Sequence, residues 1–211
     1  MRLTSGTVAP EFTAASVRGS RVSLDNLRGG AVLLKFYRFA ACPICNLHLR
    51  ELSLRHDELA AAGLTVVVLY HSPLERIERE QGHALPFELV ADPDKRIFEA
   101  YGVEASLKGM FSRAVARDYV RAMGAGHFSR PLGHEGGIQG HPADFLVGPD
   151  GVIRYVHYGS DYADTLRVDA ILQAAREHLT TISEYGEHAV RESIGREHDA
   201  STWRDRARLP G

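Results

Sequence analysis

A strand of the buried type, followed at once by two closely spaced cysteines and a helical pattern, constrains this fold most. The run from Ala31 to Tyr37 is apolar apart from Lys35, as expected of a strand buried on both faces. Cys42 and Cys45 come next, and apolar residues then recur at spacings of three and four. This pattern therefore predicts a strand, then a loop that carries the first cysteine, and then a helix from about residue 43 to 62.

The spacing of the two cysteines predicts redox chemistry. Proline is favoured at the first helical position, so Pro43 would place Cys42 at or next to the N-cap. Unpaired backbone N–H groups and the helix dipole stabilise an anion there, so the pKa of the Cys42 thiol should fall. Cys45 lies one turn further on, within reach of a disulfide. The pair could alternate between dithiol and disulfide.

Two other interpretations of the cysteines stay open. Cys42, Cys45 and His48 lie three residues apart on broadly one side of the helix and could supply three zinc ligands, although no further Cys or His pair completes the set. The cysteines could also be inert core residues. His127, His134 and His141 could line a site or bind a metal, but a solvated, glycine-rich loop explains them as well.

The composition is that of one ordinary domain. Of the 211 residues 44% are hydrophobic and 25% are charged, and the net charge of −2 favours neither nucleic acid nor an anionic membrane as a partner. The first residues lack the apolar run of a signal peptide, and no later stretch is long and apolar enough to span a bilayer. Two cysteines are too few for a secreted disulfide scaffold. We expect a cytoplasmic protein.

Strands and helices alternate early in the chain and a hairpin comes late. This order predicts an α/β fold in which a central mixed sheet is flanked by helices. The domain is expected to span residues 1–180, with a helical insertion at about 106–140, before the last hairpin, and a polar extension over 181–211. The further elements expected are strands at 64–70, 87–91, 144–147 and 152–158, and helices from 73, at 92–101, at about 107–123 and at 167–179.

The insertion carries a row of basic residues. Arg113, Arg117 and Arg121 share one helical face. Such a row is usually a solvated face, but it could help to gather an anionic substrate. Because the insertion interrupts the fold just before the Pro142 loop, we expect it to cover the active-site side and to restrict access.

Four motifs in the right order resemble the peroxiredoxin-like branch of the AhpC/TSA group, over roughly residues 4 to 175. They are Gly-Thr-Val-Ala-Pro-Glu-Phe (6–12), Leu-Leu-Lys-Phe-Tyr before the cysteines (33–37), Pro-Phe-Glu-Leu-Val-Ala-Asp-Pro with Tyr-Gly-Val (86–93 and 101–103), and Phe-Leu-Val-Gly-Pro-Asp-Gly-Val-Ile-Arg (145–154). The resemblance implies a thioredoxin-like fold and a thiol-dependent oxidoreductase with an antioxidant role.

The chain also departs from the family pattern, Pro-x-x-x-Thr-x-x-Cys. Aligned on the active-site strand, Cys45 takes the peroxidatic position, Cys42 stands at the Thr position and Arg38 replaces the Pro. The family's arginine before the late strand is missing, and Pro142 stands there instead. Pro142 resembles the cis-proline that packs beside the cysteines of thioredoxin-like reductases, so we expect a cis His141–Pro142 bond.

The chemistry that follows from the resemblance needs no organic cofactor. The substrate would be a peroxide or a disulfide, and electrons would come from an external thiol, either thioredoxin-like or of low molecular weight. A homodimer is an open alternative. Cys42 and Cys45 are the expected catalytic residues, supported by Arg38, Pro43 and Pro142. The competing function is a non-catalytic redox sensor or zinc-binding module built on the same two cysteines.

Overall fold

One mixed sheet of five strands organises the chain. The computed structural model describes residues 1–82, 84–103, 112–126 and 140–179. The strands are ordered β5-β4-β3-β6-β7, and β1 and β2 form a separate hairpin. β3, β4 and β5 are parallel, whereas β6 is antiparallel to β3, and β7 to β6. The strands are β1 (Thr13–Ala15), β2 (Arg21–Ser23), β3 (Ala31–Phe36), β4 (Leu64–Tyr70), β5 (Glu88–Ala91), β6 (Ala143–Val147) and β7 (Ile153–Tyr158).

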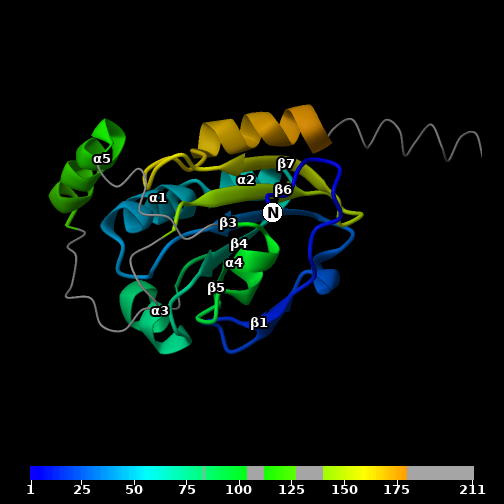
Figure 1. Ribbon diagram of the computed structural model, residues 1–211, viewed down its shortest axis with the longest axis horizontal. Coiled ribbons are helices and arrows are strands. Elements are labelled where there is room, and N and C mark those ends of the chain that lie inside the picture. The colour runs from blue at the N-terminus through cyan, green and yellow to red at the C-terminus, as the bar shows by residue number, and fades with distance from the viewer. Residues whose placement is uncertain (83, 104–111, 127–139, 180–211) are drawn as a thin grey trace, which may run out of the picture.

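Helices cover both faces of this sheet (Figure 1). They are α1 (Pro43–Leu54), α2 (His56–Ala61), α3 (Leu74–Gln81), α4 (Arg96–Ala100) and α5 (Arg113–Gly124), and residues 168–179 are also helical. The mixed sheet with flanking helices confirms the predicted α/β, thioredoxin-like fold. No helix in the described ranges has the length and apolar character needed to cross a membrane.

Successive residues of the central strands point to opposite faces of the sheet, and each face has its own hydrophobic core. Leu33, Val66 and Val68 point into a cluster with α1, α2, α3 and the helix over 168–179, and this cluster also contains both cysteines. Leu34 and Phe36 point the other way, toward α4 and the amino-terminal segment. The central strands are apolar along their whole length because helices and loops cover both faces of the sheet.

Two predicted helices differ from the structure in their bounds. The helix expected over 43–62 is divided at Arg55, whose φ of −113° ends α1, and α2 follows. The inserted helix begins at Arg113, because Ser112 is its N-cap and the Ser112 Oγ accepts a hydrogen bond from Val115 N at 3.1 Å. Residues 104–111, most of the predicted loop that contains His127 and His134, and the extension lie outside the described residues.

The predicted cis bond is wrong, because the His141–Pro142 peptide is trans. Pro142 O accepts a hydrogen bond from Gly159 N at 2.9 Å, one step beyond the Ala143–Tyr158 pair that ends the β6–β7 ladder. The chain is therefore already extended and paired with the end of β7 at Pro142. Pairing within the sheet thus continues through Pro142 and holds this segment extended.

Candidate active site

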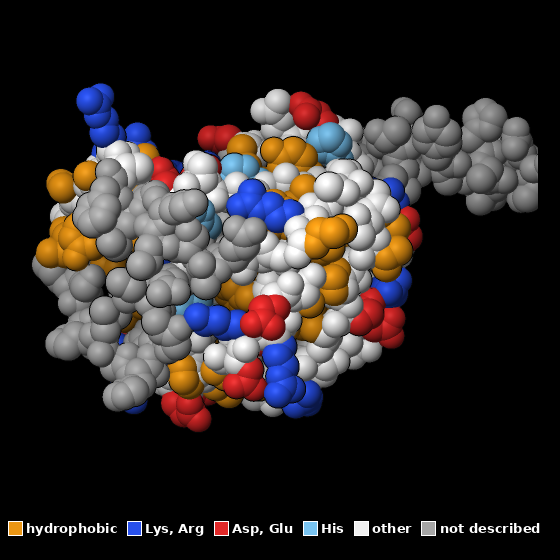
Figure 2. Space-filling view, in the orientation of Figure 1, with side chains coloured by type: hydrophobic (Ala, Val, Ile, Leu, Met, Phe, Trp, Pro, Cys, Tyr) orange, Lys and Arg blue, Asp and Glu red, His pale blue; other side chains and the backbone are white. Residues whose placement is uncertain are grey.

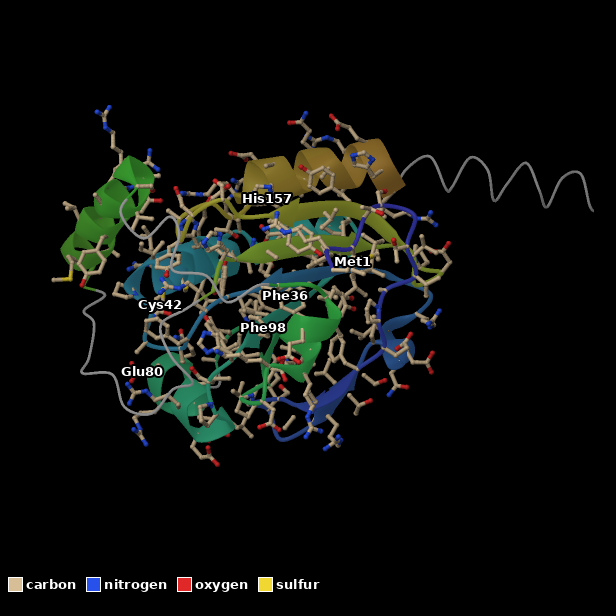
Figure 3. The ribbon with its side chains drawn as sticks, in the orientation of Figure 1. Met1, Phe36, Cys42, Glu80, Phe98 and His157 are labelled. Carbon is tan, nitrogen blue, oxygen red and sulfur yellow. The ribbon has the colours of Figure 1, made fainter. Side chains whose placement is uncertain are left out.

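Cys42 lies between the end of β3 and the start of α1 (Figure 3), and Cys45 lies in the first turn of α1. Cys42 is the N-cap of α1, with φ −68° and ψ 116°, and Pro43 occupies the first turn, as predicted. The Cys42 Sγ accepts a hydrogen bond from Cys45 N at 3.3 Å, and the Cys45 Sγ lies 2.6 Å from it. Both are free thiols, and they are only 1% and 3% exposed.

The two thiols differ in acidity. Burial alone would raise the pKa of Cys42, but the hydrogen bond from the Cys45 thiol, the charge of Arg38 and the backbone N–H groups of Cys45 and Ile44 lower this pKa to about 7. Burial raises the pKa of Cys45 well above its ordinary value, and the hydrogen bond that it donates to Cys42 adds to the effect. Near neutral pH the thiolate is therefore on Cys42, which is the nucleophilic form.

Arg38 supplies the positive charge nearest to this thiolate. Its Nη1 lies 3.9 Å from the Cys42 Sγ, and its guanidinium stacks on Tyr162 at 3.5 Å from the ring centroid. The side chain is 6% exposed. A buried guanidinium held by an aromatic face keeps its charge and its position, so Arg38 can stabilise an anion at Cys42.

Side chains from the neighbouring β4–α3 region hold the cysteine loop. Ser72 Oγ accepts a hydrogen bond from Ala40 N at 2.9 Å. Gln81 donates from Nε2 to Ala40 O at 2.7 Å and to Asn46 Oδ1 at 2.8 Å. The loop is thus fixed on both sides of Cys42, which preorganises the thiol. Nothing in the sequence pattern pointed to Ser72 or Gln81, because they approach the cysteines only through the tertiary fold.

A cavity of about 260 Å³ opens on the other side of Arg38. Its lining comes from the β3 and β4 ends, from α4 and from the segment before β6, and includes Arg38, His71, Lys95, Phe98, Glu99 and His141. His141 also bonds through Nδ1 to Gly159 O at 2.8 Å. On the face shown in Figure 2 the described basic and acidic side chains are interleaved.

His48 joins α1 to the inserted helix. It is 5% exposed, and its Nε2 lies 3.6 Å from Asp118 Oδ2 on α5. Arg117 and Arg121 flank Asp118 at 2.9 Å and 3.7 Å, while their own side chains are more than half exposed. Among the described residues no group of three His, Cys, Asp or Glu side chains is arranged to hold a metal. α5 thus lies against the helix of the cysteines, although most of the insertion falls outside the described residues.

The burial of His48 has a consequence for acid stability. Burial, Arg167 and Lys35 lower the pKa of His48 from 6.5 to about 4, although Asp118 opposes the shift. Unfolded chains bind a proton at this imidazole near pH 6.5 and folded ones only near pH 4, so acidification through this window favours unfolding.

We expect His48→Gln to remove this acid sensitivity. Between pH 7.5 and 4.5 the wild-type free energy of unfolding should fall by about 2.5 kcal/mol more than that of the variant. Urea unfolding of both reduced proteins at the two pH values measures the difference. If the free energy of unfolding falls equally in the two proteins, the pKa of His48 is not lowered in the folded state.

A buried ion pair next to the active-site strand was not predicted. Lys35 Nζ contacts Asp144 Oδ1, and both side chains are 1% exposed. Lys35 also donates to Thr165 Oγ1 and Leu166 O, each at 3.1 Å, and Asp144 accepts from Leu166 N at 2.7 Å. Lys35 and Asp144 face each other across β3 and β6. Each of the two otherwise apolar strands carries one charged residue, and the two charges are opposite. This was the sequence signal that could have revealed the pair.

The remaining predicted residues have mixed outcomes. Pro142 is buried directly before β6, where its carbonyl oxygen accepts a hydrogen bond from Gly159 N. Its position beside the cysteines stays a prediction. Arg113, Arg117 and Arg121 are exposed, in agreement with a solvated face. The structure thus brings together Cys42, Cys45, Arg38 and Pro43.

Known proteins share this fold and sequence pattern. The family model "AhpC/TSA family" matches residues 5–156. Peroxiredoxin Bcp of Escherichia coli is 27% identical over 179 residues, which cover 83% of this chain and 97% of that protein. A putative peroxiredoxin of Mycobacterium tuberculosis is 32% identical over 54% of this chain and 73% of its own length.

A solved structure agrees with this relationship at the level of the fold. The crystal structure of peroxidoxin BcpB from Mycobacterium tuberculosis superposes with a TM-score of 0.62 at 17% identity, covering 83% of this chain and 98% of that one. The family match spans most of the chain and includes both cysteines and the late hairpin. The chain therefore belongs to the AhpC/TSA family and is a peroxiredoxin-like oxidoreductase of the thioredoxin superfamily.

Proposed function

We propose that this protein reduces a peroxide with Cys42 as the attacking thiol and Cys45 as the resolving thiol. The single observation that carries the proposal is the setting of the Cys42 sulfur, which caps α1, accepts a hydrogen bond from Cys45 N and lies 3.9 Å from Arg38 Nη1. This setting lowers the pKa of Cys42 to about 7, whereas burial raises the pKa of Cys45. The Cys42 thiolate attacks one peroxide oxygen, the O–O bond breaks, and the alcohol or water leaves with a proton. Cys42 becomes a sulfenic acid.

The second thiol completes the turnover. Cys45 attacks the Cys42 sulfur, the S–O bond breaks, and the oxygen leaves as water with the Cys45 proton. The product is a disulfide across one helical turn. An external thiol, thioredoxin-like or of low molecular weight, then returns the pair to the dithiol by two exchange steps.

Arg38 supports the first step. In the family pattern a Thr and a later Arg polarise the peroxide, and neither stands at its usual place in this chain. Arg38, 3.9 Å from the Cys42 Sγ, offers a fixed positive charge where the peroxide oxygens would carry negative charge. The cavity that Arg38 lines has room for a small peroxide beside the same guanidinium that lies 3.9 Å from the Cys42 sulfur.

Disulfide exchange with another protein is the second candidate. A low-pKa cysteine at an N-cap with a partner three residues on supports it, because the same pair can attack an external disulfide. The trans His141–Pro142 bond removes one of the features on which this candidate rested. We therefore place peroxide reduction first.

A thiol count tests the proposal. Mixing the reduced protein with one equivalent of hydrogen peroxide should remove two alkylatable thiols, and a mild reductant should restore both, as read by intact mass. Excess dithiol should then support continuous peroxide consumption. An unchanged thiol count, together with stoichiometric zinc in the sample, would instead favour the zinc-binding alternative.

A further inference from the structure

Two buried tyrosines beside the cysteines have no assigned role. Tyr37 and Tyr70 are 1% and 0% exposed, and neither hydroxyl has a hydrogen-bond partner within the described part of the chain. A buried hydroxyl without a partner has lost its hydrogen bonds to water and gained none, so native structures rarely keep one without a reason. Phenylalanine would fill the same space without this cost.

Their strands place both tyrosines in the core that also contains the reacting sulfurs. Tyr70 ends β4, and Tyr37 directly follows β3, the strand that leads into the cysteine loop. The two strands are adjacent and parallel, Tyr37 N donates to Leu69 O at 2.9 Å, and the two ring centroids are 5.8 Å apart. Both rings pack in the same core cluster as Cys42 and Cys45.

The Tyr70 hydroxyl keeps its proton. Burial, followed by the charges of Cys45 and Cys42, raises the pKa of Tyr70 well above its ordinary value. The group is therefore a hydrogen-bond donor throughout the working pH range. The charges of both cysteines act on the pKa of Tyr70, whereas the pKa of Tyr37 is raised by burial and then by Tyr70, Asp144 and Cys45.

We propose that the Tyr70 hydroxyl donates a hydrogen bond to the oxygen that Cys42 acquires from the peroxide, and that this bond speeds the closure of the disulfide. The inference rests on the proposed function. In the dithiol form this oxygen does not exist, which explains why the hydroxyl has no partner there. When Cys45 attacks, negative charge develops on the departing oxygen, and a fixed donor stabilises it. Tyr70 keeps its own proton, since the water that leaves takes the proton of Cys45.

Tyr70→Phe tests the inference in the 211-residue chain. Reduced wild type and variant are mixed with one equivalent of hydrogen peroxide and quenched at intervals with dimedone, which traps sulfenic acid, or with an alkylating agent. Intact mass then gives the sulfenic acid and the disulfide at each time. We expect sulfenic acid to form at nearly the wild-type rate, disulfide to form about 10- to 100-fold more slowly, and the dimedone adduct on Cys42 to accumulate.

A structural role would produce a different result. Because the hydroxyl lacks a partner in the dithiol form, reduced Tyr70→Phe should be as stable as wild type or more stable in urea. Tyr101→Phe is the matched control, since the Tyr101 hydroxyl donates to Pro10 O at 2.9 Å in the other core. That control should lose stability and still close its disulfide at the wild-type rate. Tyr37→Phe, assayed in the same way, shows whether the Tyr37 hydroxyl also speeds the closure of the disulfide.

Each outcome decides between the two proposals. If wild type closes its disulfide and Tyr70→Phe does so equally fast, the inference is wrong and the proposed function stands. Destabilised Tyr70→Phe would show that the hydroxyl already has a structural partner, which also contradicts the inference. If wild type forms sulfenic acid but no disulfide, the proposed role of Cys45 fails, and the inference fails with it.

Discussion

Cys42→Ser is expected to lower the rate constant for peroxide consumption by at least about 10³-fold, because it removes the only thiol that is ionised near neutral pH. Cys45 cannot replace it, since burial and the hydrogen bond to Cys42 raise its pKa. The measurement is stopped-flow oxidation of the reduced variant by hydrogen peroxide. Wild-type rates should rise with pH through about 7 as Cys42 loses its proton.

Cys45→Ser is the matched variant. The serine hydroxyl can still donate to the Cys42 sulfur, so the thiolate stays stabilised and the first step should keep nearly its wild-type rate. The variant should stop at a Cys42 sulfenic acid, and it should form a mixed disulfide with a thiol probe near neutral pH. If Cys42→Ser instead consumes peroxide fast and accumulates sulfenic acid on Cys45, the family alignment is right and our assignment is wrong.

Asp144→Asn is expected to lower the free energy of unfolding by about 3–5 kcal/mol, the largest stability effect that we anticipate. The substitution leaves the ammonium of Lys35 buried at 1% exposure without a countercharge. Breaking one partner of a buried pair costs more than the pair itself contributes, because the remaining charge has lost its solvation as well as its partner. Urea unfolding of the reduced protein at pH 7 measures the loss.

The double variant Lys35→Met with Asp144→Leu separates charge from packing. Without either charge most of the loss should be recovered, but not all of it, because Leu166 N then loses its acceptor. A double variant as unstable as Asp144→Asn would show that shape at this position, not the charge, determines the stability. In that case the ion pair would contribute little.

The order of strands and helices could be predicted because it depends on local patterns. The strand over 64–70 and the two strands of the late hairpin were recovered within a residue or two from their apolar runs and the Pro-Asp-Gly turn. Cys42 at the N-cap also follows from local rules, since Pro43 fits only the first turn of a helix. Such features need no knowledge of what packs against them.

The division at Arg55 and the trans His141–Pro142 bond could not be predicted in the same way. The helix pattern continues through Arg55, and it is the packed structure that ends α1 there. The resemblance to reductases favoured a cis bond, but the hydrogen bond from Gly159 to Pro142 extends the pairing of β6 with β7 and requires an extended chain. The conformation at Pro142 thus follows the pairing of β6 with β7, which the resemblance to reductases did not predict.

The sequence by itself determined the family, the sheet and the helix-start position of Cys42, because short motifs and strand periodicity encode these directly. The N-cap position also predicted that the pKa of Cys42 falls, but only the tertiary structure showed how burial and the charge of Arg38 act on this pKa. Arg38 stands four residues before Cys42, and its role becomes visible only when it stacks on Tyr162, from far along the chain, with its guanidinium close to the sulfur. Tyr70, on another strand, packs in the same core cluster as the cysteines. Burial and the fixing of a guanidinium by a distant ring depend on which segments pack together, and no local pattern encodes that.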